Sequence, residues 1–141
     1  MAEATNPVFP QSGGCQCGAV RYELRAPPFG MWACHCNICR KQSGSAFGLS
    51  MGVALDALVF VQGEPAVWTR ETESGHILDC LFCPTCGSRL VHRRHAHEGR
   101  QTLKPGTLDD TSWVVPGRHF FPESALDWVM PLLDAETPTP S

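Results

Sequence analysis

The sequence predicts a mainly β fold built as one domain. Short apolar or alternating stretches recur along the chain, and turn-forming residues separate them, as is typical of strands joined by tight turns. Only two segments are candidates for a helix, and both are short. The length of 141 residues fits a single domain that buries its own core. We expect a loose segment at residues 1–12, the domain at 13–134 and a disordered tail at 135–141.

Strands are expected wherever an apolar or alternating stretch lies between turn signals. A tight turn at residues 13–18 comes before the first of them, and a charged loop at residues 93–99 follows the last. The predicted strands lie at residues 19–24, 29–33, 46–53, 57–62, 66–69, 76–82 and 88–92.

The two helical segments have clear stop signals. The first is a short turn at residues 37–43, and Gly44 should end it. The second lies at residues 124–133, where Pro131 limits the length of any helix. The chain contains no internal repeat.

The charge balance and the termini exclude several classes of partner. The chain has eleven Lys and Arg residues and fourteen Asp and Glu residues, so its net charge is −3, and its isoelectric point is near 6.0. This balance argues against nucleic acid or an anionic membrane as the partner. Residues 1–14 lack the features of a signal peptide, and no stretch approaches the ~18 apolar residues of a membrane span. We therefore expect a cytoplasmic protein, in which clustered cysteines are more often metal ligands or redox groups than disulfides.

Two cysteine pairs predict a structural metal site. Cys83 and Cys86 lie in the turn C-P-T-C-G, whose glycine lets the backbone fold around a metal and aim amides at the sulfurs. Cys15 and Cys17 form a similar, tighter half in C-Q-C-G. Together they make a closed four-thiolate zinc site, which would stabilise the fold through metal binding.

Two other interpretations of Cys83 and Cys86 fit less well. A thioredoxin-like dithiol has the same spacing, but it caps a helix in a βαβ unit, whereas here the chain continues into a strand. A C2H2 zinc finger needs ~12 residues between its cysteine and histidine halves. Only five residues separate Cys86 from His92.

Three further cysteines, Cys34, Cys36 and Cys39, predict a second metal site of a different kind. If Cys34 and Cys36 end a strand, their side chains share a face, and a turn can then bring Cys39 to the same point. Three thiolates without a fourth in the segment leave one zinc position for a substrate. The alternatives are a closed site completed by Cys80, and no metal at all. Cys80 equally suits a buried, inert thiol in a strand.

The histidines are less informative than the cysteines. His35 lies between two predicted ligands and should point away from the metal, in a supporting or packing role. His92, His95 and His97 are expected in a solvated loop. His119 suits a place in the core as well as one in a pocket.

Five motifs occur in a recognisable order. They are G-G-C-Q-C-G-A-V-R-Y, C-H-C-N-I-C-R-K-Q-S-G-S-A-F, F-C-P-T-C-G-S-R-L, G-T-L-D-D, and P-G-R-H-F followed by Trp128. In this order they resemble the glutathione-dependent formaldehyde-activating enzyme family, also called the GFA or centromere-protein-V family. The resemblance covers residues 13 to 130 and implies an Mss4-like fold of several coiled antiparallel sheets, zinc binding and carbon–sulfur lyase chemistry.

The resemblance also implies roles for the cysteines. The two outer pairs would hold a structural zinc and the three middle cysteines a catalytic one, so two zinc ions per chain are expected. The family pattern has seven cysteines, and Cys80 is the additional one here. The expected partners are a small thiol, glutathione or another, and a small aldehyde.

These residues suggest a mechanism. Coordination would deprotonate the thiol, and the thiolate would attack the aldehyde to form a thiohemiacetal, or the reverse step would release both. His119 or a water would supply the proton. The loop after the last ligand could grip the carboxylates of a tripeptide or simply form a solvated turn, and Phe47 could line the pocket or pack in the core. The loop residues in question are Arg40, Lys41, Ser43, Gly44 and Ser45.

Two other functions are compatible with the sequence. A zinc-stabilised interaction module would be favoured by a second zinc site that Cys80 closes. A reductase that resembles methionine sulfoxide reductase B would need a free catalytic cysteine, and only Cys80 is spare.

Overall fold

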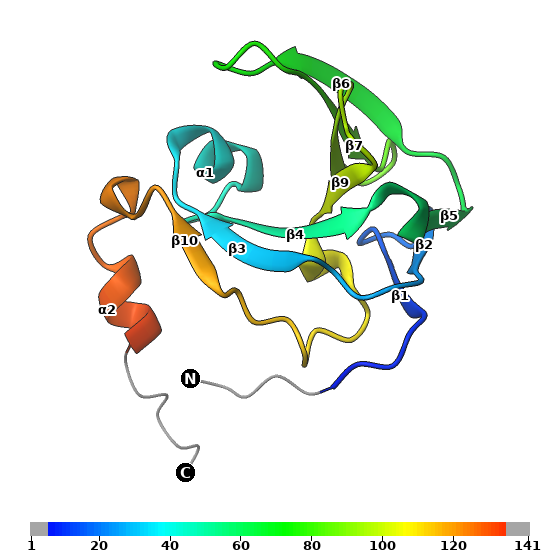
Figure 1. The fold of residues 1–141 in the computed structure, drawn as a ribbon, viewed down its shortest axis with the longest axis horizontal. Coiled ribbons are helices and arrows are strands. Elements are labelled where there is room, and N and C mark those ends of the chain that lie inside the picture. The colour runs from blue at the N-terminus through cyan, green and yellow to red at the C-terminus, as the bar shows by residue number, and fades with distance from the viewer. Residues whose placement is uncertain (1–5, 135–141) are drawn as a thin grey trace.

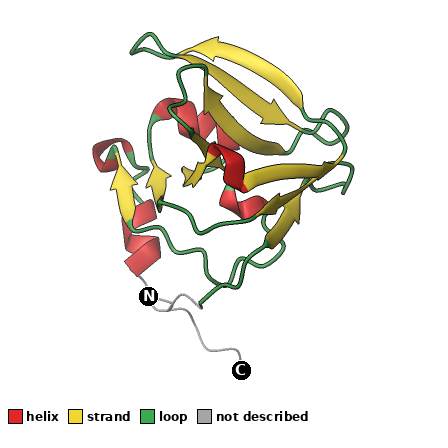
Figure 2. Cartoon of the chain, turned by 45° about the vertical axis from the view of Figure 1, so that its right-hand side comes forward, coloured by secondary structure: helices red, strands yellow, loops and turns green. Residues whose placement is uncertain are grey.

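The strands form two sheets in a computed structural model that describes residues 6–134 (Figure 1). The α-helices of this part are α1 (Asn37–Ser43) and α2 (Val129–Asp134). Strands dominate and the helices are short (Figure 2), so the predicted mainly β fold is confirmed. The strands are β1 (Gln11–Gly14), β2 (Arg21–Leu24), β3 (Gly30–Cys34), β4 (Gly48–Ala54), β5 (Leu58–Gln62), β6 (Ala66–Glu71), β7 (Ile77–Phe82), β8 (Arg89–Arg94), β9 (Arg100–Leu103) and β10 (Arg118–Phe120).

The larger sheet has seven strands in the order β10-β3-β4-β9-β8-β7-β6. Neighbouring strands are antiparallel, except that β10 runs parallel to β3. The sheet curves, and α1 lies in the hollow between β3 and β4 on one side and β6 and β7 on the other (Figure 1). We call the face that receives α1 the concave face.

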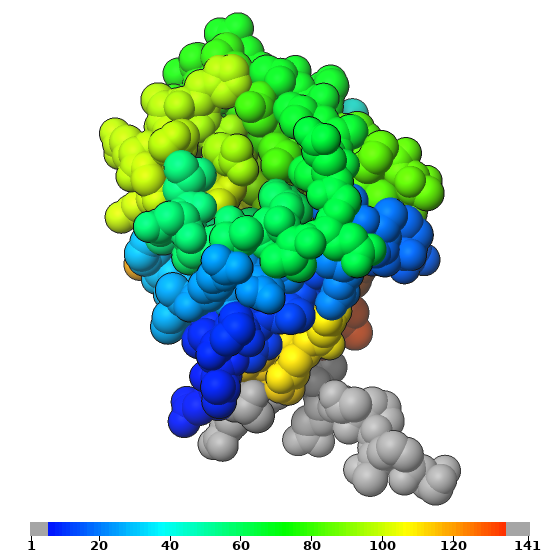
Figure 3. Space-filling model, turned by 90° about the vertical axis from the view of Figure 1, so that its right-hand side faces the viewer, coloured from blue at the N-terminus to red at the C-terminus, as the bar shows by residue number. Residues whose placement is uncertain are grey.

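The smaller sheet has the order β1-β2-β5. It contacts the segment that follows β9. A Cβ at Gly13 would come within 2.3 Å of the Tyr22 hydroxyl, so only glycine fits there. That hydroxyl is 2.8 Å from Thr107 Oγ1, and Gly13 forms a β-bridge with Leu108. The N-terminal segment and the segment after β9 consequently lie side by side (Figure 3).

One core joins the two sheets. Because side chains alternate along a strand, each strand sends every second residue to the same face. The residues facing away from α1 pack against the inner face of the smaller sheet as a single cluster. Its fully buried members include Tyr22, Leu24, Met51, Val53, Leu90, Val91 and Leu103.

The helices agree only in part with the sequence-based expectation. α1 has the predicted bounds and ends at Gly44, which adopts φ +61°. The predicted helix at 124–133 is wrong at its start, because α2 begins at Val129. Pro131 then falls in the first turn, where its missing N–H costs nothing. Among the described residues no helix has the length and apolar character needed to cross a bilayer.

The predicted strands match the observed ones to within about two residues at each end, and β1, β9 and β10 were not predicted as strands. β1 begins at Gln11, inside the segment expected to be loose, and includes two glycines expected in a turn. β8 continues to Arg94, into the stretch expected to be a loop. Residues 1–5 and the predicted tail at 135–141 lie outside the described residues.

We expect Leu103→Ala to lower the free energy of unfolding by about 2–5 kcal/mol, because it empties a fully buried position in β9. Leu132→Ala is the matched control, since its side chain is 62% exposed, and it should change stability by about 0.5 kcal/mol or less. Urea unfolding of both variants with excess zinc measures the difference. Equal losses would contradict the described core.

Candidate metal centres and cleft

The hairpin turns that carry the outer cysteine pairs meet in space. Cys15 and Cys17 lie between β1 and β2, and Cys83 and Cys86 between β7 and β8. Their sulfurs all lie within 4.8 Å of one another, and we call them the four-cysteine cluster. The sulfur of Cys17 is 3.6 Å from that of Cys15 and 3.7 Å from that of Cys83. These distances match the ~3.8 Å edge of a tetrahedron with ~2.3 Å Zn–S bonds, so the cluster could hold zinc.

Each turn has the backbone that the sequence predicts for a metal-binding knuckle. Gly18 and Gly87 follow the second cysteine of their pairs and adopt φ of +81° and +82°, in the left-handed region that favours glycine. Backbone amides point at the sulfurs. The N–H of Val20, for example, donates to Cys15 Sγ at 3.2 Å.

Cys34, Cys36 and Cys39 form the second group, the three-cysteine cluster, with sulfurs within 4.8 Å of one another. Cys34 and Cys36 were expected to alternate along one strand. They do not, because β3 ends at Cys34 and Cys36 lies beyond it. Cys36 is the N-cap of α1, and its sulfur accepts the N–H of Cys39 at 3.4 Å. The start of a helix, rather than strand alternation, brings the three thiols together.

These three thiols cannot all ionise without a cation. Burial raises the pKa of Cys34, and burial with the neighbouring thiols raises that of Cys39 to about 12. Burial also opposes ionisation of Cys36, but hydrogen bonds from the N–H of Cys39 and from the other thiols outweigh it and lower its pKa. One thiolate therefore forms readily and suppresses the others. A metal ion among the sulfurs removes this conflict.

Cys80 does not belong to the three-cysteine cluster. Among residues 6–134, the ligand atoms that gather there are those of Cys34, Cys36 and Cys39 only. Cys80 is fully buried in β7, where its register partners are Trp68 and His92. This arrangement corresponds to the buried thiol that the sequence left as an alternative.

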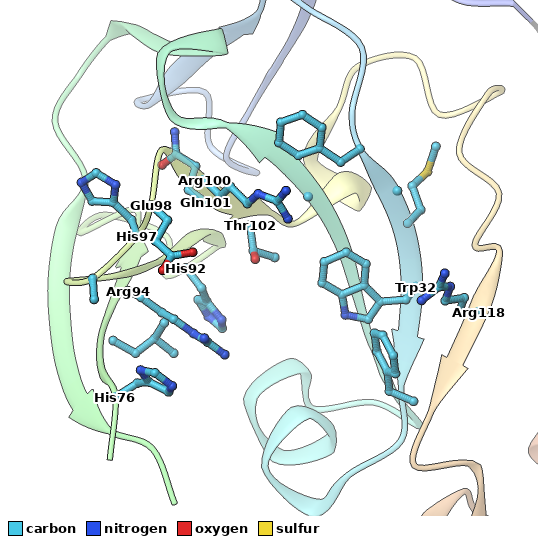
Figure 4. A pocket seen from close by; sticks show the side chains of 17 residues that line it. Trp32, His76, His92, Arg94, His97, Glu98, Arg100, Gln101, Thr102 and Arg118 are labelled. Carbon is cyan, nitrogen blue, oxygen red and sulfur yellow. The ribbon is translucent and has the colours of Figure 1, made fainter. Parts of the chain in front are cut away.

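A cleft of about 640 Å³ opens on the concave face (Figure 4). Trp32 and Phe120 stand on one wall, and residues of β7 and β8 stand on the other. Phe120 is the register partner of Cys34, and Trp32 lies two residues before Cys34 on the same face of β3. The three cysteines do not line the cleft, but Cys34 is thus a neighbour of two residues that do, and α1 lies at the lower end of the cleft in Figure 4.

The cleft is basic although the whole chain has a net charge of −3. Arg94, Arg100 and Arg118 line it with three histidines, and Glu98 is the acidic residue of its lining. None of these arginines forms a salt bridge with a described carboxylate. Arg100 instead lies over the ring of Phe29, 5.0 Å from its centroid. We call this pocket the basic cleft, and its charges suit an anionic ligand.

A bulge in β8 brings a further arginine to the concave face. The pairing of β7 with β8 shifts register beside Leu81, so that Leu90 turns into the core while Arg89 stays opposite Phe82. Arg89 then reaches His92 at 2.9 Å and lies over the Trp68 ring. Burial and the positive charges of Lys104, Arg89 and Arg70 lower the pKa of His92 to about 3.

Lys104 lies on the same face, because it follows Thr102 by two residues and contacts Ser50 of β4. Its Nζ donates to Ser50 Oγ at 3.1 Å. Burial lowers its pKa, while the thiols of Cys39, Cys34 and Cys80 act in the opposite direction. Lys104 is therefore a cation close to the three-cysteine cluster.

Residues 10–124 match the family model described as glutathione-dependent formaldehyde-activating enzyme. The chain belongs to this family. The resemblance inferred from the five motifs is thus confirmed. The fold is also similar to a crystal structure of a Rhodobacter sphaeroides protein, with a TM-score of 0.58 and 23% sequence identity. The match covers 77% of this chain and 98% of that one, and at this identity it concerns the fold alone.

The loop residues that the sequence predicted to bind substrate carboxylates lie in the second half of α1 and just after it. The hydroxyl of Ser43 donates to backbone oxygens, including that of Cys39 at 2.9 Å. Arg40 reaches Asn37 at 2.5 Å, and Phe47 packs against His35 with centroids 5.3 Å apart. The lining of the basic cleft contains none of the predicted set, which is Arg40, Lys41, Ser43, Gly44, Ser45 and Phe47.

The predicted proton donor, His119, lies on β10 and contacts His35, the residue between Cys34 and Cys36. Its Nδ1 is 2.9 Å from Nε2 of the fully buried His35. Its neighbours Arg118 and Phe120 line the basic cleft, so alternation directs His119 to the other face of β10. His35 has the supporting position that the sequence predicts.

Sequence reasoning missed most residues of the basic cleft. His92 was expected in a solvated loop, but it lies in β8 and faces the cleft. Arg94, Arg100 and Arg118 come from three different strands, which only the sheet order brings together. The available signal was strand alternation, which places Arg100, Thr102 and Lys104 on one face.

We expect this family member to lose stability in acid partly through His92. Its folded pKa is about 3, below the ~6.5 of an unfolded histidine, so the unfolded chain binds the proton first as the pH falls. Stability should therefore be full above ~6.5 and decline toward pH 3. At pH 5 the loss should be about 1–2 kcal/mol, and His92→Gln should remove it.

Unfolding free energies at pH 7.5 and pH 5 test this expectation. His97→Gln, a histidine of the same cleft, serves as the control. An unchanged difference between the two pH values in His92→Gln would show that His92 is not the group responsible.

Proposed function

We propose that the protein is a zinc-dependent carbon–sulfur lyase that forms or breaks a thiohemiacetal between a glutathione-like thiol and a small aldehyde. One observation carries the proposal. Three thiols converge without a fourth among the described residues, and Trp32 and Phe120 of the basic cleft are neighbours of Cys34 in the sheet. A thiol ligand that enters through the cleft would complete the set of four.

The cysteines fit two zinc ions with different tasks. The four-cysteine cluster would hold a closed, structural ion, and the three-cysteine cluster an ion with one free position. At the second site, zinc would lower the pKa of an incoming thiol and so supply a nucleophilic thiolate at neutral pH. The thiol-rich chain suits a reducing compartment, and we propose the cytoplasm.

The protein residues would bind and orient the thiol substrate. Arg94, Arg100 and Arg118 have no described carboxylate partner and can form charge-assisted hydrogen bonds with the substrate carboxylates. Trp32 and Phe120 would cover the apolar part of the substrate and exclude water near the sulfur.

The loop after α1 and His119, which the sequence predicted to bind substrate and to donate a proton, have supporting roles in this proposal. The loop from Arg40 to Phe47 would close the other side of the metal site. His119 would hold His35, and with it the segment that carries the ligands, through the 2.9 Å contact between their rings. The proton for the adduct oxygen would then come from water in the cleft.

The two competing functions have less support. A closed second zinc, which would favour an interaction module, needs Cys80 among the ligands, and Cys80 lies outside the three-cysteine cluster. A reductase needs an accessible catalytic thiol, and Cys80 is fully buried. Neither objection applies to the lyase.

We expect Cys36→Ser to abolish turnover of glutathione with formaldehyde and to reduce the zinc content from two ions per chain to one. The far-UV circular dichroism should remain, because the four-cysteine cluster is intact. Cys83→Ser is the control, and it should instead unfold or strongly destabilise the protein. Elemental analysis and thermal unfolding measure both effects. Global unfolding of Cys36→Ser would mark the three-cysteine cluster as structural.

We expect Arg118→Gln to raise KM for glutathione about tenfold, because one charge-assisted hydrogen bond to a carboxylate is lost. KM for the uncharged thiol 2-mercaptoethanol should not change. Arg25→Gln, outside the cleft, is the control. Steady-state kinetics with both thiols would contradict the proposed binding mode if both KM values rose together.

A further inference from the structure

Lys104 occupies an unusual position for a lysine. It follows β9, and its Nζ donates to Ser50 Oγ at 3.1 Å. Ser50 is buried in β4 and pairs in register with Trp32, which shares the concave face with Cys34. The ammonium group is thus fixed on the face that carries the three-cysteine cluster.

No carboxylate among residues 6–134 forms a salt bridge with Lys104. Arg89 repels it, the thiols of Cys34, Cys39 and Cys80 favour its charge, and Lys104 in turn lowers the pKa of His92. A partly buried cation that is paired with no acid is costly. Thiolates are therefore the counter-charge that this part of the structure offers.

A zinc ion bound by Cys34, Cys36 and Cys39 would carry a net negative charge that a nearby cation would stabilise. Zinc with three thiolates has a net charge of −1, and a thiolate as fourth ligand makes it −2. Away from bulk water, this second negative charge is unfavourable unless a positive charge lies nearby. A neutral fourth ligand, such as water or imidazole, adds no charge and needs no such compensation.

We propose that Lys104 is the residue that makes the three-cysteine centre select an anionic fourth ligand, a thiolate, over a neutral one. Ser50 holds the ammonium group in place for this purpose. The inference rests on the proposed function only in that it requires a metal ion at the three-cysteine cluster. It assigns the preference for sulfur to the charge of Lys104, separately from the carboxylate contacts in the basic cleft.

The test uses ligand binding to cobalt-loaded protein, since Co²⁺–thiolate bonds absorb in the near ultraviolet. Wild type, Lys104→Met and Lys104→Arg are titrated at one pH with 2-mercaptoethanol, which lacks carboxylates, and with imidazole, which is neutral. We expect Lys104→Met to weaken 2-mercaptoethanol binding about tenfold and to change imidazole binding by less than about twofold. Lys104→Arg should keep most of the thiol affinity.

Ser50→Ala provides a second variant that leaves the charge in place. It should weaken 2-mercaptoethanol binding less than Lys104→Met does, because the ammonium group is no longer held by Ser50 but remains on the concave face. Cobalt content, measured for every variant, shows whether the centre itself is intact.

The outcomes separate the two proposals. If Lys104→Met with full cobalt binds 2-mercaptoethanol as tightly as wild type, or loses both ligands equally, the role of Lys104 is refuted. If wild type shows the expected ligand selectivity but does not turn over thiol and aldehyde, the lyase proposal fails and the role of Lys104 stands. If the wild-type cobalt centre binds neither ligand, both proposals fail.

Discussion

The contact between two distant hairpin turns is the constraint on which the rest of the structure depends. Cys17 and Cys83 are 66 positions apart, yet their sulfurs lie 3.7 Å from each other. The first turn belongs to the small sheet and the second to the large one, so the four-cysteine cluster joins the two sheets at their ends. Closing so long a loop costs chain entropy, and metal binding at the junction can offset that cost. The shared core joins the same two sheets over a larger area.

The curvature of the large sheet converts this framework into a binding site. Its outer face is apolar and packs in the core, whereas its concave face carries arginines, histidines and Lys104 around α1. Positive charges gathered in a recess attract anions more strongly than the same charges spread over a convex surface. The chain as a whole is acidic, so the recess contrasts with its surroundings. The basic cleft and the three-cysteine cluster therefore lie near each other on the same face of the sheet.

Short sequence patterns predicted those features of the structure that depend mainly on neighbouring residues. The bounds of α1, its stop at Gly44, the three-cysteine cluster and the two separate turns of the four-cysteine cluster follow from short motifs whose geometry hardly depends on the rest of the chain. The basic cleft could not be predicted in the same way. Arg94, Arg100 and Arg118 meet only because β8, β9 and β10 take particular places in the sheet order, and sequence spacing does not encode that order. A register shift then places Arg89 on the concave face and Leu90 in the core.

The parallel pairing of β10 with β3 has a consequence for the order of assembly. The segment with the three middle cysteines lies near the start of the chain, but its edge is covered by residues synthesised some 80 positions later, since the N–H of His35 donates to the carbonyl of Phe120 at 3.0 Å. During synthesis, the segment that carries Cys34, Cys36 and Cys39 is therefore complete well before the strand that covers its edge. The sheet edge beside these thiols can close only after β10 has been synthesised.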